Sequence, residues 1–72
     1  MTTHGPVLPM WNCGGCGAPW PCHTRQQELR AEFDGASLSL ALYLGAQLVR
    51  ACEDLSWLPA GVLHQRFLGW LR

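Results

Sequence analysis

Three of the four cysteines in this chain lie within one short stretch, WNCGGCGAPWPCHT, which runs from residue 11 to residue 24. This cluster constrains the fold because a chain of 72 residues is only marginally stable on a hydrophobic core alone. Domains of this size commonly add a disulfide, a metal ion or a partner chain. We therefore expect the cysteine stretch to hold the fold together.

The spacing of the cysteines predicts a metal site. Cys13 and Cys16 are two residues apart, so both sulfur atoms can bind one ion, and Cys22 follows after five more residues. Backbone N–H groups in such a turn can donate to the thiolates, and the glycines at 14, 15 and 17 tolerate the positive φ values that the turn needs. A closed tetrahedral zinc site requires one further ligand. The sequence predicts zinc bound by Cys13, Cys16, Cys22 and a fourth residue.

The fourth ligand is open among His64, His23, Cys52 and His4. We predict His64, because a ligand on the last helix would tie that helix to the cysteine loop. His23 is adjacent to a cysteine, and neighbouring residues rarely reach one ion without strain. Cys52 on the inner side of the second helix fits a buried free thiol better than a ligand.

The start of the sequence lacks the basic and apolar regions of a signal peptide. The longest apolar run, residues 40–46, is too short to cross a bilayer. We therefore expect a cytoplasmic protein without membrane association, where clustered cysteines indicate metal binding or redox activity rather than disulfides. A redox role is the weaker expectation, because a thioredoxin-like C-x-x-C opens a helix, whereas prolines follow this one.

The expected fold is a single all-α domain of three helices with an N-terminal metal-binding cysteine loop. Residues 1–12 show no periodicity and are predicted to form an extended arm, followed by the loop at 13–23. The first helix is expected to begin at Thr24, which forms a capping box with Gln27, and to end at the Asp34-Gly35 pair.

The second helix is predicted over residues 37–55, with Ser37 as its cap. Leu40 and Leu44 provide a second apolar face, so the helix is apolar nearly all round at its start, as is typical of a central helix. Gly45 allows a close helix crossing. The main apolar stripe recurs at helical spacing and comprises Leu38, Ala41, Leu42, Gly45, Leu48, Val49 and Cys52.

The third helix is predicted after the turn at residues 56–59, with Pro59 in its first turn. It is expected to extend to about residue 71. One face of this helix is apolar and is formed by Leu63, Phe67, Trp70 and Leu71.

Composition favours a protein partner. Five arginines balance five acidic residues and lysine is absent, so the chain has no net charge; nucleic-acid binders carry a basic patch, and we expect no nucleic-acid partner. A small domain cannot easily bury four tryptophans. Trp11 and Trp20 are expected to cover the thiolates, leaving one or two others exposed as an anchor for another protein. Arg50 and Arg66 are expected to be solvated. Association into a homodimer is an alternative that the sequence does not decide.

Two resemblances accompany these motifs. The order W-x-C-x-x-C-G-x-P-W-P-C from Trp11 to Cys22, then Thr24-Arg25 and RFLGW at 66–70, resembles a group of small actinobacterial zinc-finger-like proteins, some labelled flavin reductases. This resemblance spans most of the chain and implies zinc. The C-x2-C-x5-C spacing is also similar to three cluster ligands of the WhiB-like iron–sulfur regulators, which implies a cluster with Cys52 as the fourth ligand.

The sequence therefore predicts a small helical module, held together by zinc, that binds another protein as a regulator or accessory factor and is not an enzyme. The alternative is a DNA-binding or iron–sulfur transcriptional regulator, in which the second helix, the SWLP turn and the third helix form a helix-turn-helix. A redox protein is the third reading.

Overall fold

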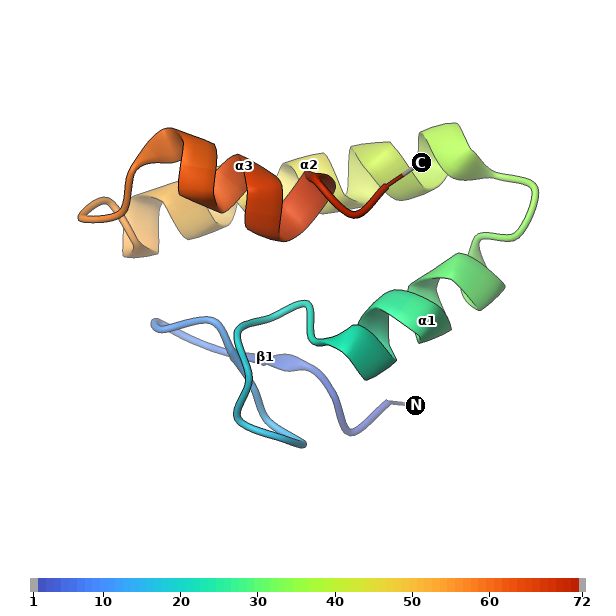
Figure 1. Cartoon of the computed structure of the whole chain (residues 1–72), viewed down its shortest axis with the longest axis horizontal. Coiled ribbons are helices and arrows are strands. Elements are labelled where there is room, and N and C mark those ends of the chain that lie inside the picture. The colour runs from blue at the N-terminus through green and yellow to red at the C-terminus, as the bar shows by residue number, and fades with distance from the viewer. Residues whose placement is uncertain (1, 72) are drawn as a thin grey trace.

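The computed structural model describes residues 2–71, which form three helices and a small two-stranded sheet. The elements in chain order are β1 (Pro6–Val7), β2 (Asn12–Cys13), α1 (His23–Glu32), α2 (Ser37–Asp54) and α3 (Ala60–Leu68). The three predicted helices are confirmed, but the fold is mixed rather than all-α. In Figure 1, α2 and α3 lie side by side in one layer, and α1 with the hairpin forms a second layer.

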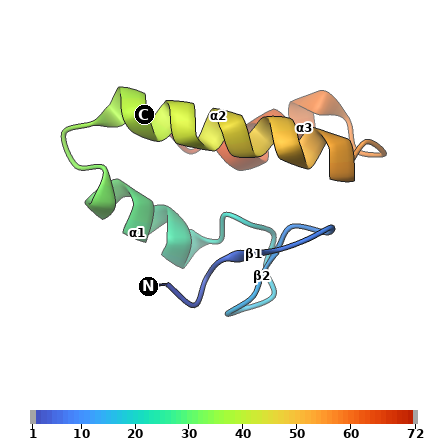
Figure 2. The ribbon, with the colours of Figure 1, turned by 180° about the vertical axis from the view of Figure 1, so that it is seen from behind.

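The N-terminal segment folds into an antiparallel hairpin rather than the predicted extended arm. Pro6 pairs with Cys13 and Val7 pairs with Asn12. Each strand has only two residues, which is too short to show the alternating pattern that identifies strands in a sequence. The hairpin returns the start of the chain to the cysteine loop, as Figure 2 shows from behind.

The start of α1 differs from the predicted capping box. The helix begins at His23, and its N-cap is Cys22, whose Sγ accepts a hydrogen bond from the backbone N–H of Arg25 at 3.4 Å. The side chain of Gln27 lies against His23 instead of reaching back to Thr24. The helix ends at Glu32, and the turn that follows contains the left-handed glycine that was predicted there, with a φ of 76° at residue 35.

The core lies between the two layers and is entirely apolar. The C-cap of α2 is Leu55 and the N-cap of α3 is Pro59, so the turn between them is short. The predicted face of α3 is confirmed, since Leu63 and Phe67 are buried and the residues at 70 and 71 are half-buried. The buried cluster comprises Trp11, Trp20, Leu29, Leu40, Leu44, Ala51, Leu55, Leu63 and Phe67.

The face that α2 buries is the shorter of its two apolar faces. Leu40, Leu44 and Ala51 are in the core, whereas most of the main stripe is exposed, including Cys52, which was predicted on the inner side. A helix that is apolar nearly all round cannot bury both faces when only one layer packs against it.

The N-cap of α2 is the residue before Ser37, and no side chain caps it. No helix within residues 2–71 has the length and apolarity to cross a membrane.

Candidate metal centre

Four side chains from separate segments meet at one point beneath the helices. His4 precedes β1, Cys13 ends β2, Cys16 lies in the following turn, and Cys22 precedes α1. Their ligand atoms all lie within 4.8 Å of one another. The Nδ1 atom of His4 is 3.1 Å from the Sγ atom of Cys13 and 3.4 Å from that of Cys22. These four residues, which we call the Cys3His cluster, lie close enough to bind a metal ion.

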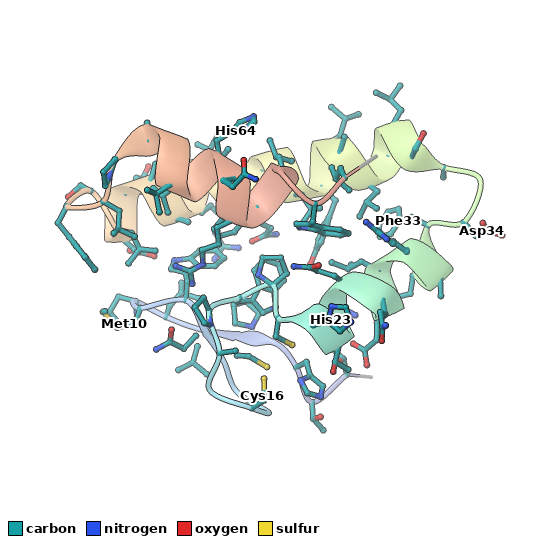
Figure 3. All side chains as sticks on the ribbon, viewed as in Figure 1. Met10, Cys16, His23, Phe33, Asp34 and His64 are labelled. Carbon is teal, nitrogen blue, oxygen red and sulfur yellow. The ribbon has the colours of Figure 1, made fainter. Side chains whose placement is uncertain are left out.

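The histidine in this cluster is His4 rather than His64. His64 is exposed on α3, and Figure 3 shows it at the opposite edge of the molecule from Cys16. His23 is also exposed, and its Nε2 lies 3.2 Å from the side-chain nitrogen of Gln27. Cys52 is exposed on α2, which packs in the other layer. The structure thus brings the three predicted cysteines together and supplies the fourth residue from the N-terminal segment.

The hairpin and a glycine bring His4 to the cysteines. The backbone N–H of Gly14 donates to the carbonyl of Gly5 at 2.8 Å, and the indole N–H of Trp20 donates to the carbonyl of His4 at 3.0 Å. A Cβ atom at Gly15 would lie 2.9 Å from the carbonyl oxygen of Thr3 and 3.0 Å from Nδ1 of His4. Only glycine at position 15 therefore leaves room for the imidazole.

The turn that follows Cys13 donates one backbone N–H group to its sulfur and another to its carbonyl oxygen. The N–H of Gly15 lies 3.3 Å from the Sγ of Cys13, and the N–H of Gly17 donates to the carbonyl of Cys13 at 2.8 Å. Of the three glycines expected to tolerate the positive φ values of this turn, Gly17 adopts one, at 77°. Such N–H donors stabilise thiolates, which are the form that binds metal.

The pKa values of the Cys13 and Cys22 thiols are shifted in opposite directions. Burial raises the pKa of Cys13, but hydrogen bonds from the backbone of Gly15 and Cys16, together with contacts to the side chains of Cys16 and His4, outweigh this and lower the pKa to about 6. Burial raises the pKa of Cys22, and the neighbouring cysteines add to the rise, although the N–H of Arg25 opposes it. A cation would therefore stabilise this site, because neighbouring thiolates repel one another and a positive charge between them offsets that repulsion.

Aromatic side chains fix the cysteine loop to α3. Trp11 and Trp20 are fully buried, and their ring centroids are 5.9 Å apart, while each lies 5.7 Å from the ring of Phe67. The indole N–H of Trp11 donates to the carboxylate of Asp54 at 2.7 Å, which links the segment just before the loop to the end of α2. The two tryptophans are thus part of the core itself.

Arg66 was predicted to be solvated, but it joins α3 to the loop. Its guanidinium donates to the backbone carbonyl of Trp20 at 2.9 Å and also to the carbonyl of Trp11. Trp11, which accepts the second contact, lies in the left-handed region at a φ of 59°, which is uncommon outside glycine. No acidic residue close in sequence indicates this role, and only the position of Arg66 directly before the apolar Phe67 could have suggested partial burial.

Comparisons with protein-family models, with curated proteins and with solved structures find no match for this chain.

Proposed function

We propose that this chain is a small protein-binding module whose fold is held together by one zinc ion in the Cys3His cluster. The observation that carries the proposal is the convergence of four donor atoms, all within 4.8 Å of one another, from segments 18 residues apart in sequence between His4 and Cys22. Three thiolates and one imidazole form a common ligand set of structural zinc sites.

The spacing of the donors favours a single ion over an iron–sulfur cluster. With Zn–S bonds of about 2.3 Å, sulfur atoms at the corners of a tetrahedron are about 3.8 Å apart. Ligands to different irons of a cluster must lie farther apart, because the cluster has several metal centres of its own. The donor separations here leave space for one ion.

The ligand count favours a structural role over a catalytic one. A catalytic zinc site keeps one position open for water or substrate, whereas four protein ligands fill a tetrahedral shell. A structural ion also fits the size of the chain, since zinc binding supplies folding free energy to domains with small cores.

The charged side chains favour a protein partner over nucleic acid. Within residues 2–71, Arg25 pairs with two glutamates and Arg50 donates to a glutamine. Arg30 and Arg66 donate to backbone carbonyls. DNA binding needs arginines or lysines free to contact phosphates. The exposed side of α3, which would be the recognition helix, is uncharged at Gly61, Val62, His64 and Gln65.

Exposed apolar side chains provide the surface for a partner. The tip of the hairpin and the turn between α2 and α3 lie at the same end of the molecule in Figures 1 and 2. These segments expose Leu8, Met10 and Trp57, and the indole of Trp57 is 66% exposed. Exposed tryptophan is enriched among the residues that dominate binding energy at protein interfaces.

Metal analysis and chelation test this proposal. Elemental mass spectrometry on protein purified without chelator should give one zinc per chain, and an anaerobic sample should be colourless. A strong chelator should abolish the helical circular dichroism signal, because metal binding and folding are coupled. Cys16→Ser should mimic chelation, whereas the matched Cys52→Ser change outside the cluster should not. Iron with a brown chromophore, or full helicity without metal, would overturn the proposal.

A further inference from the structure

Part of the main apolar stripe of α2 stays exposed within residues 2–71, although Leu48 of the same stripe packs against the core. Leu38, Leu42 and Val49 are 73%, 67% and 65% exposed, and Gly45 and Cys52 continue the same line along the helix. The steps between these residues alternate between four and three, which keeps them on one face of a helix. This surface, which we call the α2 stripe, runs along the longest helix of the fold.

Within residues 2–71, no packing contact accounts for the glycine in the middle of the stripe. Glycine in a helix interior costs about 1 kcal/mol relative to alanine. A Cβ atom at Gly45 would meet nothing within 4 Å, so packing within the chain does not require a residue without a side chain at this position. A glycine lets another backbone approach closely. The open surface at Gly45 therefore leaves room for the backbone of another molecule to approach closely.

The two ends of α2 carry complementary charges that are unpaired within residues 2–71. At the N-terminus, no side chain caps the free N–H groups and no acidic residue lies in the first turn, so this end is partially positive. At the C-terminus, Glu53 is exposed and no basic residue lies in the last turn, so this end is negative. An antiparallel neighbour of the same sequence places each negative end beside a positive one.

We propose that two copies of this chain associate through their α2 stripes, antiparallel and crossing at Gly45. When the pair is centred between Gly45 and Ala46, Leu42 of one copy faces Val49 of the other. In the same arrangement Glu53 lies at the level of Leu38, in the first helical turn of the second copy. This inference rests on the proposed function, because the metal-held fold positions α2, and it identifies a second copy of the chain as one protein partner.

The size of the stripe sets the strength of the association. A helix of 18 residues is about 27 Å long, and one face of it covers less than the roughly 800 Å² per partner of a standard interface. The dimer is therefore weak and dissociates on dilution through the micromolar range, in line with other small interfaces.

Sedimentation velocity on the zinc-loaded full chain, from low micromolar to several hundred micromolar, tests the association. The wild-type chain should shift from monomer to dimer with concentration. Leu42→Glu should weaken dimerisation at least about tenfold, and Gly45→Leu should do the same by filling the crossing point. Val62→Glu, a matched change at a half-exposed site on α3, should leave the dimer intact. All three residues are solvent-accessible or open in the monomer, so zinc content and helicity should stay unchanged.

Cross-linking tests the antiparallel arrangement. In the proposed pair, the two Cys52 residues are about 20 Å apart along the helix axis, so a short thiol-specific bis-maleimide should not link wild-type chains. In Leu38→Cys the new thiol lies close to Cys52 of the other copy, and the reagent should link the two chains. A wild-type cross-link, a dimer that survives Leu42→Glu, or a zinc-loaded monomer at every concentration would overturn the proposal. A chain without zinc and without helices would instead show that the proposed function fails.

Discussion

Replacing His4 by alanine separates the metal site in the structure from the one that the sequence alone suggests. The side chain of His4 is half-buried, with Nδ1 close to two thiols of the cluster. The variant removes the imidazole but keeps the backbone carbonyl that accepts from the indole of Trp20. The hairpin can therefore form in the variant, and we expect the substitution to weaken metal binding rather than the hairpin.

The expected loss follows from dividing the binding free energy among the ligands. Structural zinc in small domains is worth about 10–16 kcal/mol, so each of four ligands contributes about 2.5–4 kcal/mol if the share is even. A water molecule can take the position that His4 leaves, which places the loss near the lower limit. We expect His4→Ala to weaken zinc binding about 100-fold, since 2.7 kcal/mol corresponds roughly to that factor.

Competition with a chromophoric chelator of known zinc affinity measures this loss at neutral pH. Cobalt provides a second readout, because its absorption spectrum reports the number and type of ligands in a tetrahedral site. His64→Ala is the matched control and should change the affinity less than twofold, since that residue is exposed on α3. Equal affinities for His4→Ala and the wild type, or a comparable loss in His64→Ala, would refute the assignment of the fourth ligand.

Three further changes probe the surroundings of the site. Phe67→Ala, which empties a fully buried position between two indoles, should lower the free energy of unfolding by about 3–5 kcal/mol in urea titrations; a loss below about 1 kcal/mol would contradict this packing. Gly15→Ala should weaken zinc binding about tenfold by pushing His4 away, whereas Gly61→Ala, where a Cβ atom meets nothing, should leave the affinity unchanged. The Thr2 hydroxyl, at 2.6 Å, lowers the pKa of Glu28. The Glu28 carboxylate therefore stabilises the fold at pH values above its pKa in the unfolded chain, about 4.3. This stabilisation is lost as the pH falls through the lower pKa of the folded state. Glu28→Gln should lower the urea midpoint of zinc-saturated protein at neutral pH, by an amount that shrinks in acid; a constant difference would argue against a stabilising role of the ionised carboxylate.

The sequence predicts those parts of the fold in which neighbouring residues determine the structure. The helices could be predicted because apolar residues recur every three or four positions over many turns, and α2 begins at Ser37 as expected. The C-x-x-C spacing likewise places two sulfur atoms near one another by local geometry alone. Cys22 joins them because the residues between are few, and the structure brings all three thiols together.

The parts that depend on distant contacts could not be predicted in this way. His4 reaches the cysteines only because a hairpin of two-residue strands reverses the chain, and strands this short leave no pattern in the sequence. Choosing between the two apolar faces of α2 was also beyond local reasoning. Leu40 and Leu38 are equally apolar, and only the position of α1 and the loop decides which of them is buried.

The contacts of the cysteine loop connect the Cys3His cluster to the helical core. Trp11 and Trp20 lie on either side of Cys13 in sequence, and their carbonyls both accept hydrogen bonds from Arg66 on α3. If the metal leaves, the loop loses the ligand bonds that hold its shape, and the two indoles lose their positions against Phe67. Two of the three buried aromatic rings then have no fixed position. Loss of zinc should therefore unfold α3 together with the loop rather than release the loop alone, because Arg66 of α3 is hydrogen-bonded to the backbone on both sides of Cys13.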